Sequence, residues 1–371
     1  MQPGLYVHVP FCRGKCHYCD FYSCCSQERM AAWLAALAAE IILTKDQDWS
    51  HPFDSLYLGG GTPSLLPPEM LTKVFLALRG HFPFVPAPEI TLEANPDDVT
   101  LEKLRLWRQL GVNRLSLGIQ SLNDAELRFL GRRHDAAQAR RAVELARLAG
   151  FENLNVDLMY ALPGQTMAAW QASLAGILAY RPEHLSCYQL TVAEHTPLGE
   201  RVSRRELVLP GEEEQRTFFL GTSEFLAAHG YGHYEVSNFA LRPQYFSRHN
   251  CKYWQHVPYL GLGPAAHSFD GRRRWWNVAS VAEYCRQLAE GREPVAGSEV
   301  LTDSQLRLET LALGLRTRQG VARAILKHFP QADRLITDLC ETGFLEVQQE
   351  RLCPTREGLV VADSLAMMLS I

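Results

Sequence analysis

Short apolar runs alternate with stretches of helical periodicity through the first half of the chain. The apolar runs predict β-strands at Leu5–Val9, Ser55–Leu58, Glu89–Glu93, Arg114–Gly118, Asn153–Leu158 and Leu185–Leu190. The periodic stretches predict helices at Glu28–Thr44, Pro68–Arg79, Leu101–Leu110, Ala136–Ala149 and Met167–Tyr180. Strands that alternate with helices form parallel units with right-handed crossovers. Six units cannot close an eight-stranded barrel, so we predict an α/β fold, a partial (β/α)6 TIM-like barrel, with its chemistry at the carboxyl ends of the strands.

The second half of the chain has a different pattern. Residues 1–235 hold the predicted core barrel, and residues 236–300 form an aromatic-rich connecting segment. Residues 301–371 predict a small winged-helix-like α+β domain. Its elements are expected as helices at Ser304–Arg316, Val321–Phe329 and Gln331–Glu341, a hairpin of Gly343–Val347 and Arg351–Cys353, and a final helix from Thr355.

Composition narrows the class of protein. The chain has 371 residues, 47% of them hydrophobic, and its 37 Lys and Arg against 41 Asp and Glu give a net charge of −4. We therefore expect no nucleic-acid partner. No apolar run reaches the length of about 20 residues that spans a bilayer, and the start of the chain does not read as a signal peptide. Ten cysteines, five of them between residues 12 and 25, indicate metal binding or catalysis in a reducing cytoplasm rather than disulfides.

The strongest chemical signal is the spacing Cys12-x3-Cys16-x2-Cys19, just beyond the first predicted strand. Three thiolates on one short loop can hold three irons of a [4Fe-4S] cluster and leave the fourth iron open to an exchangeable ligand. A structural zinc site is the alternative. It needs a fourth protein ligand, for which His17, Cys24 and Cys25 are candidates.

Three consecutive glycines follow the second predicted strand, in Gly59-Gly60-Gly61-Thr62-Pro63-Ser64. Without Cβ atoms their backbone can approach a ligand closely. The cysteine spacing and this glycine motif together resemble the radical S-adenosylmethionine (SAM) superfamily. The resemblance implies that the amine and carboxylate of SAM chelate the open iron, and that an electron from the cluster cleaves the sulfonium to a 5′-deoxyadenosyl radical.

The segments 6–12 and 59–64 resemble, more narrowly, the oxygen-independent coproporphyrinogen III oxidase (HemN-like) branch. In that family the positions matching Gln120, Arg132 and Asp157 contact a second SAM molecule. Judged alone, Glu93 and Asp157 are equally suited to a helix cap or a buried salt bridge, and Arg132 to a solvated surface charge. The SAM contacts that we expect are Tyr6, Tyr18, Gly60, Gly61, Thr62, Glu93, Gln120, Arg132 and Asp157.

The chain departs from the oxidases in ways that resemble the HemW-type heme chaperones. Phe21 stands where the oxidases have a further cysteine, and only eleven residues precede Cys12. The segment His249-Asn250-Cys251-Lys252-Tyr253-Trp254 matches the HNxxYW motif associated with heme in that group. This implies heme binding by His249, with Tyr253 and Trp254 against the macrocycle. A buried core histidine is the alternative, and the rival ligands are His233, His256 and His267.

The resemblance implies a heme chaperone that binds heme, carries a [4Fe-4S] cluster and SAM, and delivers heme to membrane respiratory enzymes. It implies a cytoplasmic location with peripheral contact at the inner membrane, and it leaves a homodimer open. The basic run Arg272–Arg274 suits heme propionates, an anionic membrane surface or an exposed turn. The alternatives are an oxygen-independent coproporphyrinogen III oxidase, which would make the chain an enzyme, and a structural zinc protein.

Overall fold

The computed structural model describes residues 2–44, 49, 51–328 and 332–370. Its central feature is a curved sheet that contains all the strands expected in the first half of the chain. These strands pair in parallel, each with the next along the chain, as the partial barrel requires. The predicted fold class is therefore confirmed. The strands are β1 (Gly4–Val9), β2 (Phe53–Gly60), β3 (Phe84–Ala94), β4 (Arg114–Gln120), β5 (Leu154–Tyr160) and β6 (His184–Gln189).

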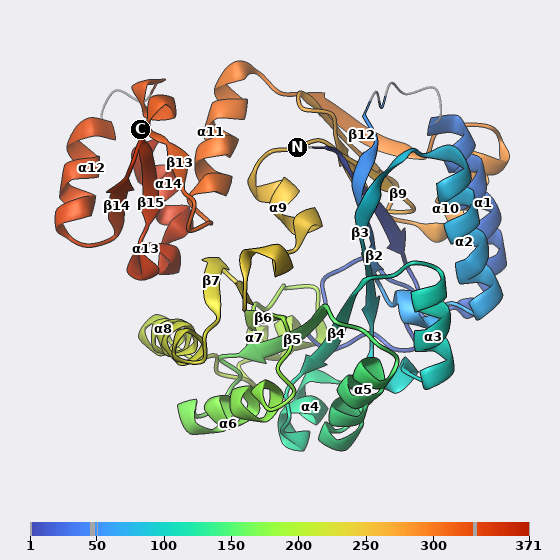
Figure 1. Cartoon of the computed structure of the whole chain (residues 1–371), viewed down its shortest axis with the longest axis horizontal. Helices are drawn as coiled ribbons and strands as arrows, with labels where there is room; N and C mark the ends of the chain where they lie inside the picture. The colour runs from blue at the N-terminus through green and yellow to red at the C-terminus, as the bar shows by residue number, and fades with distance from the viewer. Residues whose placement is uncertain (1, 45–48, 50, 329–331, 371) are drawn as a thin grey trace.

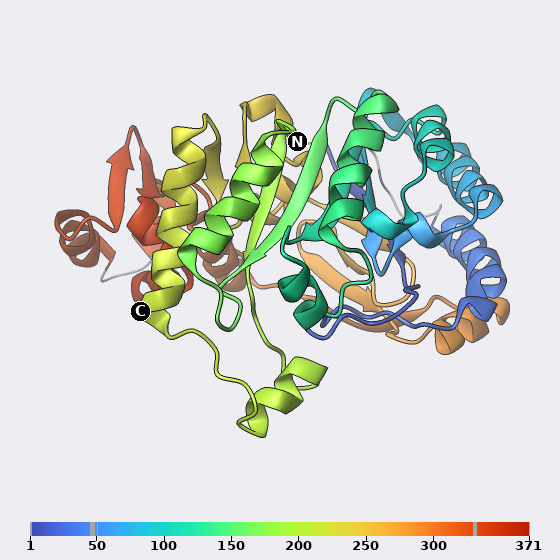
Figure 2. The same cartoon turned by 90° about the horizontal axis from the view of Figure 1, so that it is seen from below.

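Helices cover the outer face of this sheet (Figure 1), and Figure 2 shows them along the outside of the curve from below. A short helix after β4 was not expected. Trp33, Trp107 and Trp170 lie fully buried where three of the helices pack against the strands. Such burial of large apolar side chains is the main source of the stability of the fold. The helices are α1 (Met30–Leu43), α2 (Pro68–His81), α3 (Leu101–Gln109), α4 (Asp124–Leu130), α5 (Ala136–Leu148) and α6 (Met167–Leu178).

The middle of the chain adds strands to both edges of the sheet. After α7 (Pro197–Ser203) and α8 (Glu212–Ala228), strands β7 (Gly232–Glu235) and β8 (Asn238–Ala240) continue it beyond β6. Beyond β1 lie β9 (Tyr259–Leu262), β10 (His267–Phe269), β11 (Arg273–Asn277) and β12 (Val295–Val300). Only β9 runs parallel to its neighbour β1. Two helices, α9 (Arg248–Trp254) and α10 (Val281–Ala289), belong to the same segment.

The C-terminal unit has its own small antiparallel sheet and apolar core. It comprises α11 (Asp303–Gly314), β13 (Val321–Ala322), a 3-10 helix at Arg323–His328, α12 (Ala332–Glu341), β14 (Leu345–Gln348), β15 (Arg351–Pro354), α13 (Arg356–Val360) and α14 (Ala362–Leu369). The predicted hairpin is confirmed as β14 and β15.

The helix predicted from Val321 is wrong at its start, because Val321 pairs with Leu352 of β15 and is buried in the small core. Phe329 and Gln331, the ends of two predicted helices, lie outside the described residues. Among the described residues, no helix combines the length and the apolar character needed to cross a membrane. The domain boundaries after residues 235 and 300 stay a prediction.

Candidate functional site

The three motif cysteines lie on the loop that follows β1. The backbone closes this loop, since the Cys24 N–H donates to Pro10 O at 2.7 Å and the Cys12 N–H donates to Cys24 O at 3.0 Å. The thiols of Cys12, Cys16 and Cys19 are half-buried. Burial raises the pKa of Cys12 and of Cys19, and the neighbouring cysteines add to both shifts. The loop therefore gathers thiols that a positive partner would convert to thiolates.

The zinc alternative gains no support from the geometry. Within residues 2–44, 49, 51–328 and 332–370, no three or more His, Cys, Asp or Glu side chains are grouped to hold a single metal ion. Of the candidate fourth ligands, His17 is bonded through Nδ1 to Phe129 O at 2.9 Å, and Cys24 packs against the main apolar core. A cluster offers each thiolate a separate iron, so its ligands stand further apart than those of one ion. The donor set of three thiols on one loop fits such a cluster.

The glycine turn after β2 packs directly against the cysteine loop. The Gly61 N–H donates to Val9 O at 2.8 Å. A Cβ atom on Gly61 would lie only 2.8 Å from the carbonyl oxygens of Phe11 and Val9, so glycine is required here. The next residue, Thr62, places its hydroxyl oxygen 3.4 Å from the Sγ of Cys12. The two motifs that the sequence predicts to adjoin are thus in contact.

Arg132 connects this turn to the second cysteine. Its Nη1 donates to the Sγ of Cys16 at 3.4 Å, and its Nη2 donates to Asn95 Oδ1 at 2.6 Å. The Asn95 amide donates in turn to the Thr62 hydroxyl at 3.1 Å. Arg132 is therefore not a solvated surface charge. No role for Asn95 was predicted, although its position two residues after Glu93, at the carboxyl end of β3, was a signal for one.

Glu93 and Asp157 line the inner face of the sheet. The Tyr57 hydroxyl donates to Glu93 Oε1 at 2.6 Å, and burial raises the pKa of Glu93 to about 7 despite this bond. Asp157 accepts from Asn155 Nδ2 at 2.7 Å and from Ser116 Oγ at 3.2 Å, and burial raises its pKa as well. In the described part of the chain, neither carboxylate caps a helix or forms an ion pair within 4.0 Å.

The remaining predicted SAM contacts lie on the same sheet or at its carboxyl end, and Tyr6, in the middle of β1, also contacts His249 with 6.3 Å between the ring centroids. Tyr6 on β1 is hydrogen-bonded through its hydroxyl to His8 Nδ1 at 3.1 Å. Tyr18 stands next to Arg132, whose charge and hydrogen bond oppose the effect of burial, which raises the pKa of the phenol. Gln120 ends β4 with a φ of 69°, a left-handed conformation uncommon for a side chain of this size. The fold thus gathers all the predicted positions, and their role in binding SAM stays a prediction.

Helix α9, which carries the HNxxYW motif, lies at the opposite, amino end of the strands. Glu89, near the amino end of the paired part of β3, accepts the backbone N–H groups of Arg248 and His249 at 3.0 Å each. Lys252 is fully buried, and its ammonium pairs with Asp54 Oδ1 at 2.5 Å and donates to a backbone oxygen near the N-terminus. These contacts fix α9 across the end of the barrel.

His249 has the environment of a core histidine. It is 1% exposed, its Nδ1 is hydrogen-bonded to Ser55 Oγ at 3.0 Å, and its Nε2 to the Tyr253 hydroxyl at 2.9 Å. Burial lowers its pKa to about 3. The Trp254 ring is covered by the guanidinium of Arg316, 5.4 Å from the ring centroid. Heme ligation by His249 stays a prediction, and in this arrangement neither ring nitrogen is free.

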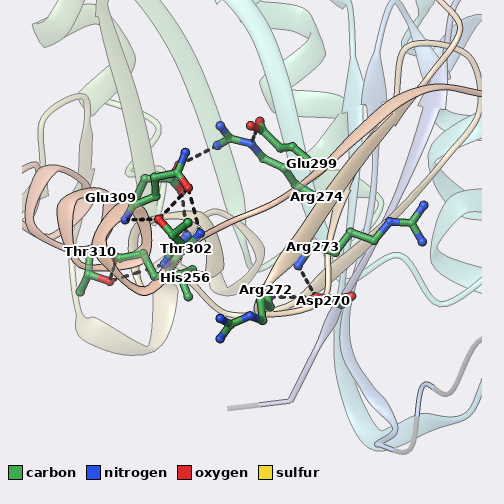
Figure 3. Close-up of polar contacts among 11 residues, drawn as sticks. His256, Asp270, Arg272, Arg273, Arg274, Glu299, Thr302, Glu309 and Thr310 are labelled. Atoms are coloured by element: carbon green, nitrogen blue, oxygen red, sulfur yellow. Dashed lines mark hydrogen bonds and ion pairs between the residues drawn. The ribbon is translucent and has the colours of Figure 1, made fainter.

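The basic run 272–274 leads into β11 and is largely neutralised. Figure 3 shows Arg274 pointing toward Glu299 and Glu309, both of which pair with it, while Arg273 points away from them. Arg272 pairs with Asp303 at 3.0 Å. Arg273 lies over the ring of Trp275 instead, 5.4 Å from the centroid. Two of the three cations are thus committed to acidic partners within the chain.

Comparison with known proteins shows the family of the chain. The family model described as the radical SAM superfamily matches residues 6–175. The chain is 35% identical to the heme chaperone HemW of Bacillus subtilis (strain 168) over 97% of each chain. It is 36% identical to the heme chaperone HemW of Mycobacterium tuberculosis (strain H37Rv), over 99% of this chain and 95% of that one. The chain belongs to the HemW family of radical SAM proteins.

The solved structure of the coproporphyrinogen III oxidase HemN from Escherichia coli, a radical SAM enzyme, aligns with this chain with a TM-score of 0.85. The alignment covers 100% of this chain and 90% of HemN, at 24% identity. It shows that the fold is shared, including the C-terminal unit. The family and the fold class predicted from the sequence are both confirmed.

Proposed function

We propose that this chain is a heme chaperone that binds heme, carries a [4Fe-4S] cluster and SAM, and delivers heme to membrane respiratory proteins. The observation that carries the proposal is its similarity to the HemW heme chaperones, 35% to 36% identical over nearly the full length of both chains. The contacts of the cysteine loop support it, because they form one continuous network with the glycine turn.

In this proposal Cys12, Cys16 and Cys19 hold the cluster, and the glycine turn and Thr62 hold the amino-acid end of SAM. When bound, the cluster and SAM supply one-electron chemistry at the sulfonium. The side chains of this chain bind and orient the cluster and SAM. Arg132 fixes the loop through Cys16, and Glu93, whose pKa burial raises to about 7, accepts a hydrogen bond from Tyr57 and can hold a proton near neutral pH.

The chaperone acts from the cytoplasm and contacts the inner membrane only at its surface, where it meets the respiratory protein that accepts heme. A homodimer is a further part of the proposal. Light scattering before and after anaerobic cluster reconstitution measures it directly: a mass of twice 41.8 kDa supports the homodimer, and a mass of 41.8 kDa in both states excludes it.

The second candidate is an oxygen-independent coproporphyrinogen III oxidase, favoured by the TM-score of 0.85 with HemN. Phe21 opposes it, since it is 70% exposed beside the cysteine loop where the oxidases carry a further cysteine. An anaerobic assay with coproporphyrinogen III, SAM and a reductant separates the two functions. The chaperone yields no protoporphyrinogen, and sustained turnover establishes the oxidase instead.

Heme transfer is the direct test of the chaperone. The reconstituted protein is loaded with heme and mixed with an apo-acceptor, and transfer is followed by the acceptor's absorption. We expect transfer by the native chain and its reduction in a variant with Ser at positions 12, 16 and 19, which lacks the cluster ligands. Failure of the native chain to bind heme at all overturns the proposal.

A further inference from the structure

Four histidines in the middle of the chain are candidates for heme iron, and three of them are already engaged at both ring nitrogens. His249 bonds on both sides, as described above. His233 is hydrogen-bonded to Ser223 Oγ at 3.0 Å and to the Val236 backbone oxygen at 3.2 Å. His256 pairs through Nε2 with Glu309 at 3.0 Å, and its Nδ1 lies 3.5 Å from a threonine hydroxyl (Figure 3).

His267 differs from the other three. Its side chain is exposed, and neither ring nitrogen has a hydrogen-bond partner among the described residues. Partial burial and the charge of Arg274 lower its pKa, which favours a neutral imidazole at neutral pH. A neutral imidazole with a free nitrogen is the form that ligates iron.

An indole lies next to this imidazole. His267 on β10 is directly opposite Trp276 on β11, and the two rings stack with their centroids 6.0 Å apart and an angle of 25° between their planes. Trp276 is only partly buried. An axial imidazole stands perpendicular to the plane of the macrocycle, so an indole stacked on the imidazole does not lie flat against the porphyrin. It orients the imidazole and meets the macrocycle with its edge.

The register of the strands places this pair on the inner face of the sheet. Opposite residues of an antiparallel pair share a face, and so do residues two apart along a strand. Phe269, two residues after His267, stacks on His256 and lies beside Tyr259. Tyr259 contacts Tyr253 at 4.7 Å between centroids. Because Tyr253 in turn contacts His249 inside the barrel, His267 and Trp276 face the same interior.

The pair lies two strands from Tyr6. Gly261 of β9 pairs with Tyr6 of β1, and β10 is the next strand beyond β9. Adjacent strands are spaced by about 4.8 Å, so His267 lies roughly 10 Å across the sheet from Tyr6. His267 also affects the ionisation of His8, which is hydrogen-bonded to Tyr6. Burial lowers the pKa of His8 to about 4, and the charge of His267 adds to this shift. His249 lies nearer to Tyr6, with 6.3 Å between the ring centroids, but both of its ring nitrogens are already hydrogen-bonded.

We propose that His267, rather than His249, ligates heme iron in this chain, with its imidazole oriented by the stacked ring of Trp276. The proposal rests on the proposed function, since it concerns where the chaperone holds its cargo. It places heme on the same inner face as Tyr6 and Glu93, beside the site predicted for SAM. In this arrangement α9 has a structural role, closing the amino end of the barrel with His249 as part of the core.

Heme titration of the full chain tests the proposal. Hemin is added to the native protein and to His267→Ala, and the Soret band, stoichiometry and affinity are measured. We expect one heme per chain for the native protein. In His267→Ala we expect the imidazole-ligated Soret position to be lost. We expect the affinity for heme to be weaker by a factor of about ten or more. Added imidazole should restore the Soret position in His267→Ala, an effect that a merely structural role cannot produce.

Two further variants complete the test. Trp276→Ala should weaken affinity but keep the imidazole-ligated spectrum, because the donor remains. His229→Ala removes an exposed histidine that directly follows α8, and it should leave both the affinity for heme and the spectrum unchanged. If the native chain binds no heme, the proposed function fails. If it binds heme and His267→Ala keeps the native spectrum and affinity, the function stands and the assignment to His267 is overturned. The assignment to His267 is also overturned if the imidazole-ligated spectrum is lost in a folded His249→Gln variant and not in His267→Ala.

Discussion

Arg132 donates a hydrogen bond to the Sγ of Cys16 across 3.4 Å, although the two residues are 116 positions apart in the chain. The same guanidinium donates from Nη2 to the backbone oxygen of Gly118 at 2.6 Å. The second cysteine of the motif is therefore fixed to the carboxyl end of β4. A guanidinium that donates to a sulfur atom restricts where that atom can lie, so the contact keeps Cys16 in place on the loop. Arg132 thus holds the cysteine loop from a distant part of the sequence.

Replacing Arg132 by Met should reduce cluster retention. The variant keeps an apolar side chain of similar length but removes the positive charge from Cys16 and the bonds to Asn95 and Gly118. We expect a lower iron content per chain after anaerobic reconstitution and faster loss of the absorption near 400 nm in air. Arg133→Met is the matched control, since Arg133 is exposed and, among the described residues, its one ion pair is with Asp97 at 3.3 Å. Equal iron contents in the two variants contradict the role given to Arg132.

A methyl group at Gly61 should separate the glycine turn from the cysteine loop. In Gly61→Ala the new Cβ would lie 2.8 Å from two carbonyl oxygens, so the backbone must shift. Overpacking of this kind costs about 1–3 kcal/mol. Urea unfolding should show that loss, together with weaker SAM binding. Gly14→Ala on the cysteine loop has no atom within 4 Å of its Cβ and should match the native protein in both measurements.

The strands of the barrel could be predicted from the sequence because each is a run of buried apolar residues with Gly or Pro near its ends. Strands β9 to β12 could not, since their residues alternate with glycines and charged side chains such as Gly261, Arg274 and Gly297. Their pairing depends on β1, more than 250 residues earlier in the chain. Val321 shows the same limit, as its strand exists only because Leu352 pairs with it.

The candidate site also has a part that could be predicted from the sequence and a part that could not. The cysteine loop and the glycine turn are local motifs, and the order of parallel strands was enough to bring them together. The surroundings of His249 were not predictable, because Ser55 and Glu89 reach it from β2 and β3 across the barrel. A motif indicates which residues matter, but the exposure of His249 and His267 is set by contacts between distant strands.

Lys252 should be important for the position of α9. Replacing it with Met leaves the Asp54 carboxylate, which is 14% exposed, without its cation, and breaking a buried pair costs about 3–5 kcal/mol. We expect a lower free energy of unfolding in urea for Lys252→Met. The double variant Lys252→Met with Asp54→Leu should recover most of the loss, because no uncompensated charge remains. Lys73→Met, at an exposed position on α2, should change little. No recovery in the double variant contradicts the ion-pair explanation.

Glu40 joins α1 to the strands beyond β1 and is 3% exposed. Its carboxylate accepts from the Gly263 N–H at 2.7 Å, from Asn277 Nδ2 at 2.5 Å and from the Tyr284 hydroxyl at 2.6 Å. Burial raises its pKa to about 7, although all three hydrogen bonds oppose the shift. The group therefore titrates near neutral pH in the folded protein.

The stability of the protein should depend on pH through Glu40. An acid with a higher pKa in the folded state binds its proton more tightly there, so its stabilising contribution is full below the unfolded pKa of about 4.3 and is lost as the pH rises through about 7. Glu40→Gln resembles the protonated acid but cannot titrate, so it lacks this pH-dependent contribution. Urea unfolding should show the native protein losing roughly 1–3 kcal/mol of unfolding free energy relative to Glu40→Gln between pH 5 and pH 8. The exposed control Glu28→Gln should show no such change, and a constant difference between the native protein and Glu40→Gln means that Glu40 does not titrate in this range.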